Sequence, residues 1–197
     1  MSHPQTDFIY CYKGTEVLIN NFGLEDPEKL KKVERTLTAA RLLELIKKPV
    51  KGKFDTAHLK KIHYYLFQDV YPFAGELRRI DIAKGLMFCH CEYIKNELDK
   101  LFNNLKKENY LKNSSFEELP EKAAFYMGEI NAIHPFRDGN GRTQREFIRE
   151  LLLPLGFYTD YSRCPPRMML DASIASFNGD NKVLTKLYKM CIYPIPK

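Results

Sequence analysis

Apolar side chains recur at every third or fourth position along much of the chain, which is the spacing of one face of an α-helix. The first such stretch begins at Asp26-Pro27-Glu28, where an acidic cap, a proline and a first-turn carboxylate mark a helix start. Pro49 ends this helix near Lys48. Further helices are predicted on the same grounds. They comprise one capped by Asp55 or Thr56, one from Glu92 to about Lys107, one over 116–133 capped near Ser114 or Ser115, one from Asn140 to Leu153, one opening at Pro165-Pro166 and one from Val183 to about Cys191.

One segment departs from helical spacing. Leu77 to Ile82 reads Leu-Arg-Arg-Ile-Asp-Ile, which partly alternates between apolar and polar positions. With Lys84-Gly85 as a turn, Leu86-Met87-Phe88 can return as a second strand, so we predict a short β-hairpin. The whole pattern predicts an all-α domain with one short hairpin.

Composition limits the function without naming it. A chain of 197 residues with 44% hydrophobic and 28% charged residues is typical of one globular domain. The net charge of +6 favours anionic partners, but no basic stripe points to nucleic acid. No apolar run approaches the roughly 18 residues of a membrane span, and no secretory signal is visible. The scattered cysteines therefore indicate reduced thiols in a cytoplasm. They are Cys11, Cys89, Cys91, Cys164 and Cys191.

One stretch combines residue types that handle phosphate. It reads His134-Pro135-Phe136-Arg137-Asp138-Gly139-Asn140-Gly141-Arg142-Thr143-Gln144-Arg145. The Gly-Asn-Gly loop ends where a helix begins, and a helix N-terminus offers unpaired N–H groups to an anion. Arg142 and Arg145 share one helical face there, although cations at this end oppose the helix dipole at about 0.3–1 kcal/mol each. A bound polyphosphate would offset that repulsion.

The same stretch holds a proton acceptor and an acid suited to a metal ion. Histidine titrates near neutral pH, so His134 is a natural base beside a phosphate. Asp138 is suited to hold the Mg²⁺ of a nucleotide through one carboxylate. Taken singly, a structural histidine, an ordinary turn and a solvated arginine pair are the more common interpretations. Their combination in one short stretch favours a nucleotide site.

This stretch resembles the motif of the Fic (Fido) family, His-x-Phe-x-(Asp/Glu)-Gly-Asn-Gly-(Arg/Lys)-x-x-Arg, and matches every defined position. Tyr71 to Arg78 resembles the family's segment before a flap hairpin. Tyr12 to Leu24 resembles the start of its bacterial cell-filamentation branch, and Ser173 to Tyr188 resembles that branch's C-terminal helices. The resemblance implies a single Fic domain over residues 1–197, a helical bundle with a flap at about 79–88.

The resemblance also implies a reaction, the transfer of AMP from ATP with Mg²⁺ to a Ser, Thr or Tyr hydroxyl of a target protein, releasing pyrophosphate. In that reaction His134 deprotonates the hydroxyl and Asp138 holds Mg²⁺. Backbone groups of Gly139, Asn140 and Gly141, with the Asn140 side chain, form the anion hole. Arg142 contacts the β-phosphate side and Arg145 the γ-phosphate, while Phe136 anchors the loop. The adenine pocket is expected near Ser173–Asn178.

Two partners are implied by the resemblance. The flap, with Lys84 and Gly85 at or near its tip, binds the backbone of the target protein as an added strand. Many family members carry an inhibitory helix with the pattern (Ser/Thr)-x-x-x-Glu-(Gly/Asn). Here only Ser114 has a glutamate four residues on, Glu118, and the final Gly or Asn is missing. We therefore expect a toxin-like enzyme that a small antitoxin protein inhibits in trans through Arg145.

Two other classes stay open, a phosphoryl or phosphocholine transferase on the same scaffold and a nucleotide-binding module without activity. The intact Gly-Asn-Gly argues against the first, and His134 with Arg145 argues against the second. Cys89-His90-Cys91 has no second ligand pair for zinc, and His58 with His63 does not form a zinc-protease motif. We expect a bacterial cytoplasmic location, with secretion into a host cell as the alternative, and neither nucleic acid nor membrane as a direct partner. The target protein stays open.

Overall fold

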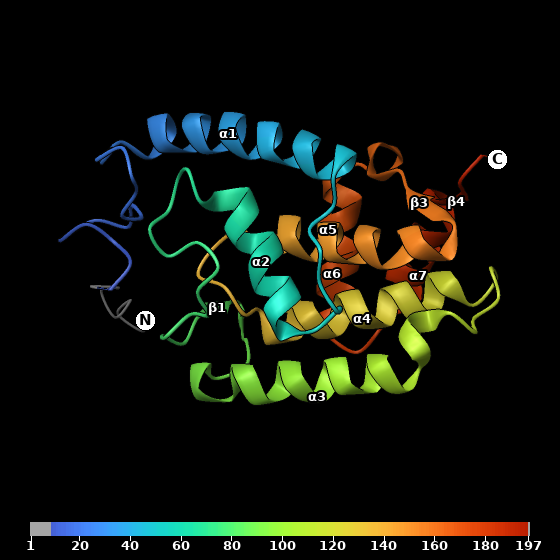
Figure 1. Ribbon diagram of the computed structural model, residues 1–197. Coiled ribbons are helices and arrows are strands. Elements are labelled where there is room, and N and C mark those ends of the chain that lie inside the picture. Colours follow the sequence, from blue (N-terminus) through green and yellow to red (C-terminus); the bar gives the residue numbers. More distant parts are fainter. Residues whose placement is uncertain (1–8, 197) are drawn as a thin grey trace.

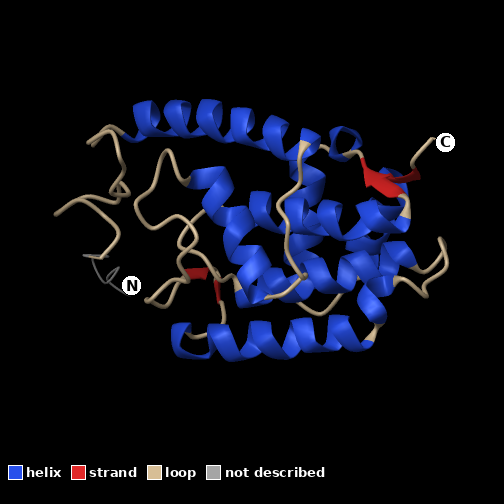
Figure 2. Ribbon diagram, in the orientation of Figure 1, coloured by secondary structure: helices blue, strands red, loops and turns tan. Residues whose placement is uncertain are grey.

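Seven α-helices form about half of the chain in the computed structural model, which describes residues 9–196 (Figure 1, Figure 2). They are α1 (Pro27–Lys47), α2 (Thr56–Phe67), α3 (Ile94–Lys107), α4 (Leu119–Ile133), α5 (Asn140–Leu152), α6 (Pro166–Phe177) and α7 (Lys182–Cys191). Short 3-10 helices lie at Cys91–Tyr93, Asn109–Leu111, Leu153–Leu155 and Tyr161–Arg163. Two antiparallel pairs of strands complete the fold, β1 (Ala83–Lys84) with β2 (Leu86–Met87) and β3 (Phe157–Thr159) with β4 (Ile192–Pro194). No helix within the described residues is long and apolar enough to cross a membrane.

Helices α4 and α5 lie at the centre of the arrangement. α4 packs against α3, α5, α6 and α7, while α5 packs against α2, which α1 covers (Figure 1). The stripe that α5 buries contains Phe147, Ile148 and Leu151, none of which is exposed to solvent. Burying a side chain of this size contributes about 1.5–3 kcal/mol. The core therefore holds both ends of the connection between the two central helices, residues 134–139.

The predicted helix starts are confirmed where an acidic side chain caps the helix. Asp26 accepts hydrogen bonds from the N–H groups of Glu28 and Lys29 at the start of α1. Asp55 accepts one from the N–H group of His58 at the start of α2. Both caps satisfy N–H groups that have no partner inside the helix. The predicted limits of α3, α5 and α7 lie within two residues of the observed ones.

The predicted start of α4 at residue 116 is wrong, because the helix begins at Leu119. Residues 116–118 form a turn instead. The N–H group of Ser115 donates a hydrogen bond to the carboxylate of Glu118 at 2.8 Å, so neither predicted serine caps α4. Pro120 in the first turn marks the start of the helix, since proline is favoured where its missing N–H costs nothing.

The predicted hairpin is present and shorter than expected. Ala83 lies opposite Met87, and Lys84 lies opposite Leu86. Gly85 joins the two strands with a φ of 83°, a left-handed value that glycine adopts without strain. Lys84 and Gly85 therefore form the tip, as predicted.

A strand over 77–82 is the part of the hairpin prediction that is wrong. This segment turns toward the end of α4, where the N–H group of Arg78 donates to the carbonyl of Pro135 at 2.9 Å. The Arg78 side chain is buried rather than exposed on one face of a sheet. The apparent alternation of the segment thus arises from a tertiary contact and not from strand pairing.

A second small sheet was not predicted from the sequence. β3 and β4 pair antiparallel, with Tyr158 opposite Tyr193 and their ring centroids 5.5 Å apart. Each strand has three residues, and its partner lies far along the chain. Neither strand is long enough to show a period-two pattern by itself.

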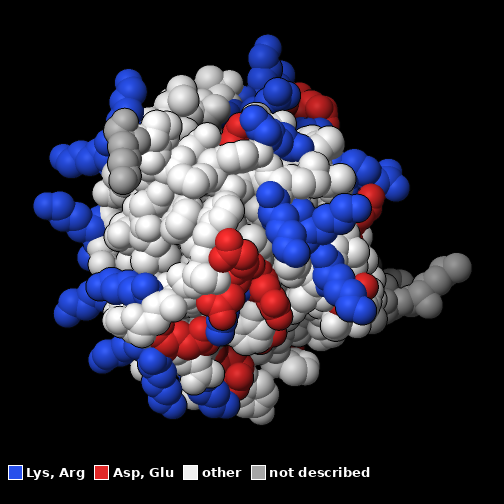
Figure 3. Space-filling model, turned by 90° about the vertical axis from the view of Figure 1, so that its right-hand side faces the viewer, with Lys and Arg blue, Asp and Glu red and all other residues white. Residues whose placement is uncertain are grey.

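Charged side chains of both signs lie on the end of the molecule that carries β3 and β4. Lys and Arg side chains project around the rim of this face and also lie to the right of its centre, and a group of Asp and Glu side chains lies in its lower half (Figure 3). The net charge of +6 therefore does not form one continuous basic surface on this face.

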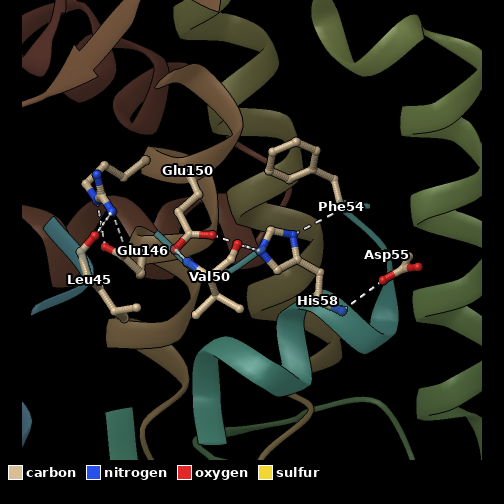
Figure 4. A network of polar contacts seen from close by, with 8 residues as sticks. Leu45, Val50, Phe54, Asp55, His58, Glu146 and Glu150 are labelled. Atoms are coloured by element: carbon tan, nitrogen blue, oxygen red, sulfur yellow. Dashed lines mark hydrogen bonds and ion pairs between the residues drawn. The ribbon is translucent and has the colours of Figure 1, made fainter. Parts of the chain in front are cut away.

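A buried polar network joins α5 to the segment between α1 and α2 (Figure 4). Its α5 side chains are Glu146, Arg149 and Glu150, and the side of α5 that they form is called its back. The Glu150 carboxylate lies 2.8 Å from His58 Nε2 and accepts a hydrogen bond from the N–H group of Val50 at 2.9 Å. The N–H group of Phe54 donates to His58 Nδ1 at 3.2 Å, so the proton of the neutral imidazole lies on Nε2 and faces Glu150. Each buried polar group here has a partner within the chain.

A second buried pair extends this network one turn along α5. Glu146 and Arg149 form an ion pair with an N–O distance of 2.5 Å. Arg149 also donates to the carbonyl of Leu45 at 3.0 Å, near the end of α1 (Figure 4). Burial raises the pKa of Glu146 to about 7. The back of α5 therefore fixes the neighbouring elements through charged groups that are paired with one another.

Candidate functional site

His134 ends α4 in a left-handed conformation, with a φ of 49°, and its N–H group donates to the carbonyl of Ile130 at 2.9 Å. Its imidazole stacks on the ring of Phe88, with the centroids 3.9 Å apart and an interplanar angle of 15°. Nδ1 lies 3.3 Å from the carbonyl oxygen of Asn131. Because a carbonyl oxygen only accepts hydrogen bonds, Nδ1 carries the proton of this contact and the lone pair of the neutral ring lies on Nε2. This is the tautomer that a general base needs.

A cavity of about 570 Å³ opens beside His134, within the usual size range of small-molecule sites. Two further residues of the motif, Gly141 and Arg145, line it with His134, and Gly85 at the hairpin tip also reaches it. The 173–178 segment, in which the adenine pocket was predicted, contributes Ser173, Ile174, Phe177 and Asn178 to the same wall. The remaining lining residues are Phe88, Met127, Asn131, Gln144, Pro166, Met169 and Leu170. The cavity is thus apolar with a few polar groups at one side.

Arg145 is the cation of this cavity. Burial lowers the pKa of its guanidinium, which is the effect expected when a charge is moved away from water. Among residues 9–196, none forms an ion pair or a hydrogen bond with this guanidinium, whereas Arg149 one turn on is paired with Glu146. A half-buried cation without an anion in the described chain is suited to bind an anionic ligand.

Arg142 faces a different part of the molecule. Its guanidinium forms an ion pair with Glu34 of α1 at 2.5 Å and donates to Thr38 Oγ1 at 3.1 Å. It also lies over the ring of Phe67, 4.6 Å from the centroid. Arg142 does not line the cavity that contains His134 and Arg145. The structure thus separates the two arginines that the motif placed on one helical face, because Glu34 neutralises the first of them.

The two glycines of the loop are required for different reasons. Gly139 has a φ of 76°, and a Cβ atom at this position would lie 2.3 Å from the ring of Phe67. Gly141 leaves room beside the cavity cation, since a Cβ atom there would lie 3.3 Å from Nη1 of Arg145. No side chain caps the first turn of α5, so its N–H groups are left for an anion. Gly139 therefore allows the loop to pack against Phe67, and Gly141 leaves space beside Arg145 in the cavity.

The side chain of Asn140 is used inside the loop. Its Oδ1 accepts a hydrogen bond from the N–H group of Phe136 at 2.9 Å, and its Nδ2 donates to the carbonyl of the same residue at 2.8 Å. The residue is 4% exposed and does not line the cavity. This arrangement does not support the predicted contact of the Asn140 side chain with phosphate, because both of its polar groups hold the loop closed.

Asp138 is half-buried at the edge of the loop and does not line the cavity itself. Its Oδ1 accepts a hydrogen bond from the N–H group of Gly139 at 2.7 Å, and its Oδ2 has no hydrogen bond within residues 9–196. The described part of the chain contains no group of three metal-ligating side chains. Mg²⁺ in nucleotide sites takes one or two carboxylates and completes its octahedron with phosphate and water. A single carboxylate oxygen at this position fits such an ion.

His63 belongs to the site but was not predicted there, because its pattern with His58 bears only on a zinc ligand. His63 Nε2 donates to the carbonyl of Asp138 at 3.0 Å, and Nδ1 accepts from the N–H group of Gly75 at 2.8 Å. Burial lowers its pKa to about 4, so it is neutral at physiological pH. Its ring stacks on that of Phe136 with the centroids 3.9 Å apart. His63 therefore holds the loop through the backbone of Asp138. The only feature of the sequence that indicated a buried role for His63 was its position on the apolar stripe of α2.

Phe88 was also missed as a site residue. Besides stacking on His134, its ring lies edge-on to Phe177 of α6, with the centroids 5.3 Å apart. Phe88 follows β2 directly, so the return strand of the hairpin sets the position of this ring. The hairpin, the base and α6 therefore meet at one wall of the cavity.

Known proteins are similar to this chain in sequence and in fold. A sequence model of the Fic/DOC family matches residues 53–152. The chain is 39% identical over 181 residues to protein adenylyltransferase VbhT of Bartonella schoenbuchensis, an alignment that covers 91% of this chain and 38% of that protein. It is 41% identical over 172 residues to probable protein adenylyltransferase y4lH of Sinorhizobium fredii, covering 86% and 88%. The chain therefore spans well under half of VbhT and most of y4lH.

The fold match is equally extensive. The crystal structure of BepC, a VirB-translocated effector protein from Bartonella tribocorum with bound AMPPNP, aligns with a TM-score of 0.90 and 30% sequence identity. The alignment covers 95% of this chain and 97% of that one. The mostly helical architecture with a small hairpin is therefore confirmed.

Proposed function

This chain belongs to the Fic/DOC family and is a protein adenylyltransferase, and we propose that it binds ATP beside His134 and transfers AMP to a Ser, Thr or Tyr hydroxyl of a target protein. One observation carries the proposal. A base, His134, and a cation with no anion in the described chain, Arg145, line the same cavity. BepC, which shares the fold, holds an ATP analogue.

The proposed transfer uses these two groups together. His134 Nε2 takes the proton of the acceptor hydroxyl, whose oxygen forms a bond to the α-phosphorus. The bond from that phosphorus to the oxygen bridging to the β-phosphate breaks, and pyrophosphate leaves. Arg145 and the N–H groups of the first turn of α5 bind the negative charge that develops on the leaving group. The stacked Phe88 ring limits rotation of the base.

Asp138 is the residue that we assign to Mg²⁺. The ion would neutralise phosphate charge when it accompanies ATP, and one carboxylate suffices to hold it. His63 supports this carboxylate indirectly, since it fixes the backbone carbonyl of the same residue. In this assignment Arg142 and Asn140 shape the loop from outside the cavity.

The hairpin and Arg145 are the two places where we propose that other proteins bind. The target backbone adds to the hairpin near Lys84 and Gly85, which brings its hydroxyl toward His134. An antitoxin would supply a carboxylate to Arg145 and so exclude the γ-phosphate. The segment from Ser114 to Glu118 leads into α4 as a turn and does not form a helix beside Arg145.

Label transfer from ATP tests the proposed reaction. Purified protein is incubated with Mg²⁺, bacterial lysate and ATP labelled at either the α- or the γ-phosphate. We expect protein-bound label from the α position alone, and a loss of about 10²–10⁴-fold in the rate for His134→Ala, the usual contribution of a general base. Binding of AMPPNP to His134→Ala should remain.

The other outcomes point to the alternatives. Label from the γ position would indicate a phosphoryl transferase. AMPPNP binding without transfer of either label would indicate a binding module.

A further inference from the structure

Arg78 is a charged side chain that the fold buries completely. The residue is 2% exposed, and burial lowers the pKa of its guanidinium. Asp81, the acid nearest to it, lies 3.8 Å away. The guanidinium is surrounded instead by backbone carbonyl oxygens, so four hydrogen bonds compensate for the loss of water.

These carbonyls belong to two separate parts of the site. Arg78 Nε donates to the carbonyl of His134 at 2.8 Å, and Nη2 donates to that of Ile133 at 3.3 Å. Nη1 donates to the carbonyl of Ile80 at 2.6 Å, and Nη2 also donates to that of Cys89. Ile80 precedes the hairpin and Cys89 follows it. The Arg78 guanidinium therefore joins the end of α4, where His134 lies, to both sides of the hairpin.

The backbone strengthens the same junction. The N–H group of Arg78 donates to the carbonyl of Pro135 at 2.9 Å, and the N–H group of Cys89 donates to that of Ala132 at 3.3 Å. Phe88, next to Cys89, carries the ring that stacks on His134. A shift of the segments that flank the hairpin would thus displace the Phe88 ring, which stacks on His134. It would also displace the hairpin tip, to which we propose that the target binds.

We propose that Arg78 is a positioning residue for AMP transfer, which holds His134 and the hairpin in a fixed relation without touching ATP. The inference rests on the proposed function. Arg78 lies outside the motif at residues 134–145. It also does not line the nucleotide cavity, so its role is to position other groups. Only arginine suits the position, because its planar fork directs donors at several carbonyls at once and the ammonium of lysine does not.

The variant Arg78→Lys tests the assignment, since it retains the charge and removes the fork. The initial rate of AMP transfer to proteins of a bacterial lysate is measured against ATP concentration, beside calorimetric binding of AMPPNP and thermal unfolding. We expect kcat to fall about 10–100-fold, as small misplacements of reacting groups do. KM for ATP and the affinity for AMPPNP should stay within about twofold of the wild type, with cooperative unfolding retained.

Arg78→Met, a second variant, should lose at least as much kcat as Arg78→Lys. Arg35→Lys, on the exposed side of α1, is the matched control and should leave the rate unchanged.

Each contrary outcome is distinct. Wild-type kcat in Arg78→Lys would overturn the proposal. An equal loss of AMPPNP affinity would place Arg78 in nucleotide binding, and loss of cooperative unfolding in both variants would make it a requirement of the fold. Either result would also overturn the proposal. A wild-type protein that transfers no label would instead refute the proposed function.

Discussion

Helix α5 carries two sets of charged side chains that differ in how their charges are satisfied. Each set is named by what it contacts: the back face comprises Glu146, Arg149 and Glu150, and the front face comprises Arg145. On the back face, Glu146 pairs with Arg149, and Glu150 contacts His58 across to α2 (Figure 4). On the front face, Arg145 lines the cavity, and no residue of the described chain is close enough to pair with it. Both faces remove charge from water, but only the back face supplies the opposite charge.

This difference separates structural charges from functional ones. A buried ion pair with its hydrogen bonds complete is a closed unit, and removing either partner leaves the other buried without compensation. Burying a cation without a partner costs free energy, and the binding of an anion offsets that cost. The front of α5 is therefore prepared for a ligand, while the back holds the fold around it.

The strongest test of the comparison removes one arginine from each face. Arg145→Ala should weaken AMPPNP binding about 100-fold, because hydrogen bonds to charged groups contribute about 1.5–3 kcal/mol each. AMP transfer should fall about 10³-fold, since the same group stabilises the leaving pyrophosphate. The free energy of unfolding should stay the same or rise, because the variant no longer buries an unpaired charge. Calorimetry with AMPPNP and urea unfolding measure the two effects.

Arg149→Ala is the matched variant on the back face and should show the opposite result. It leaves Glu146 buried without its partner, so the free energy of unfolding should fall by about 3 kcal/mol. AMPPNP affinity at 25 °C should be unchanged. If Arg145→Ala were the destabilised protein and Arg149→Ala the weak binder, the division between the two faces would be wrong.

A smaller effect is expected from the neighbouring acid of the back face. Glu150→Ala leaves the buried N–H group of Val50 without its acceptor, and it leaves Nε2 of His58 with the Val50 carbonyl alone. Each unsatisfied buried group costs about 1–3 kcal/mol, and some water enters the space, so we expect a loss of about 2 kcal/mol in urea unfolding. AMP transfer by the folded protein should remain.

The control for this variant lies on the surface. Glu44→Ala removes an exposed carboxylate that pairs with Arg41, and its effect on unfolding should be far smaller. Equal losses in Glu150→Ala and Glu44→Ala would mean that the buried network stabilises the fold no more than an exposed ion pair does.

Local chemistry explains which parts of the fold could be predicted from the sequence. The caps Asp26 and Asp55 act on N–H groups two or three residues away, so a short window of sequence contains the whole interaction. The strands β3 and β4 depend on each other across a long stretch of chain, and three residues carry no period of their own. Elements that are stabilised by distant partners leave little trace in the local pattern.

The site divides in the same way. His134 and Arg145 were predicted together because a glycine loop and helical spacing are local features. The partner of Arg142 is Glu34 on α1, and that pairing exists only in the folded chain. Arg78 and His63 act mainly through backbone carbonyl and N–H groups, which almost every residue type provides and which therefore give no sequence signal.

The last prediction concerns how the stability contributed by the back face depends on pH. Burial and the neighbouring Glu150 raise the pKa of Glu146 and Arg149 lowers it, which together place it at about 7. An acid whose pKa is higher in the folded state binds its proton more tightly there than in the unfolded chain. Its contribution to stability is therefore complete at acidic pH and is lost as the pH rises through about 7.

Glu146→Gln removes this titration while retaining the shape of the protonated acid. We expect the free energy of unfolding of the wild type to fall between pH 5 and pH 8 by up to about 1.4 kcal/mol per pH unit, the limit for one proton. The variant should lack that component, and the exposed control Glu117→Gln should retain the wild-type curve. Urea unfolding at several pH values measures all three. An identical slope in Glu146→Gln and the wild type would mean that Arg149 keeps Glu146 ionised throughout. The back face would then be a permanent ion pair, and its contrast with the unpaired Arg145 would be sharper still.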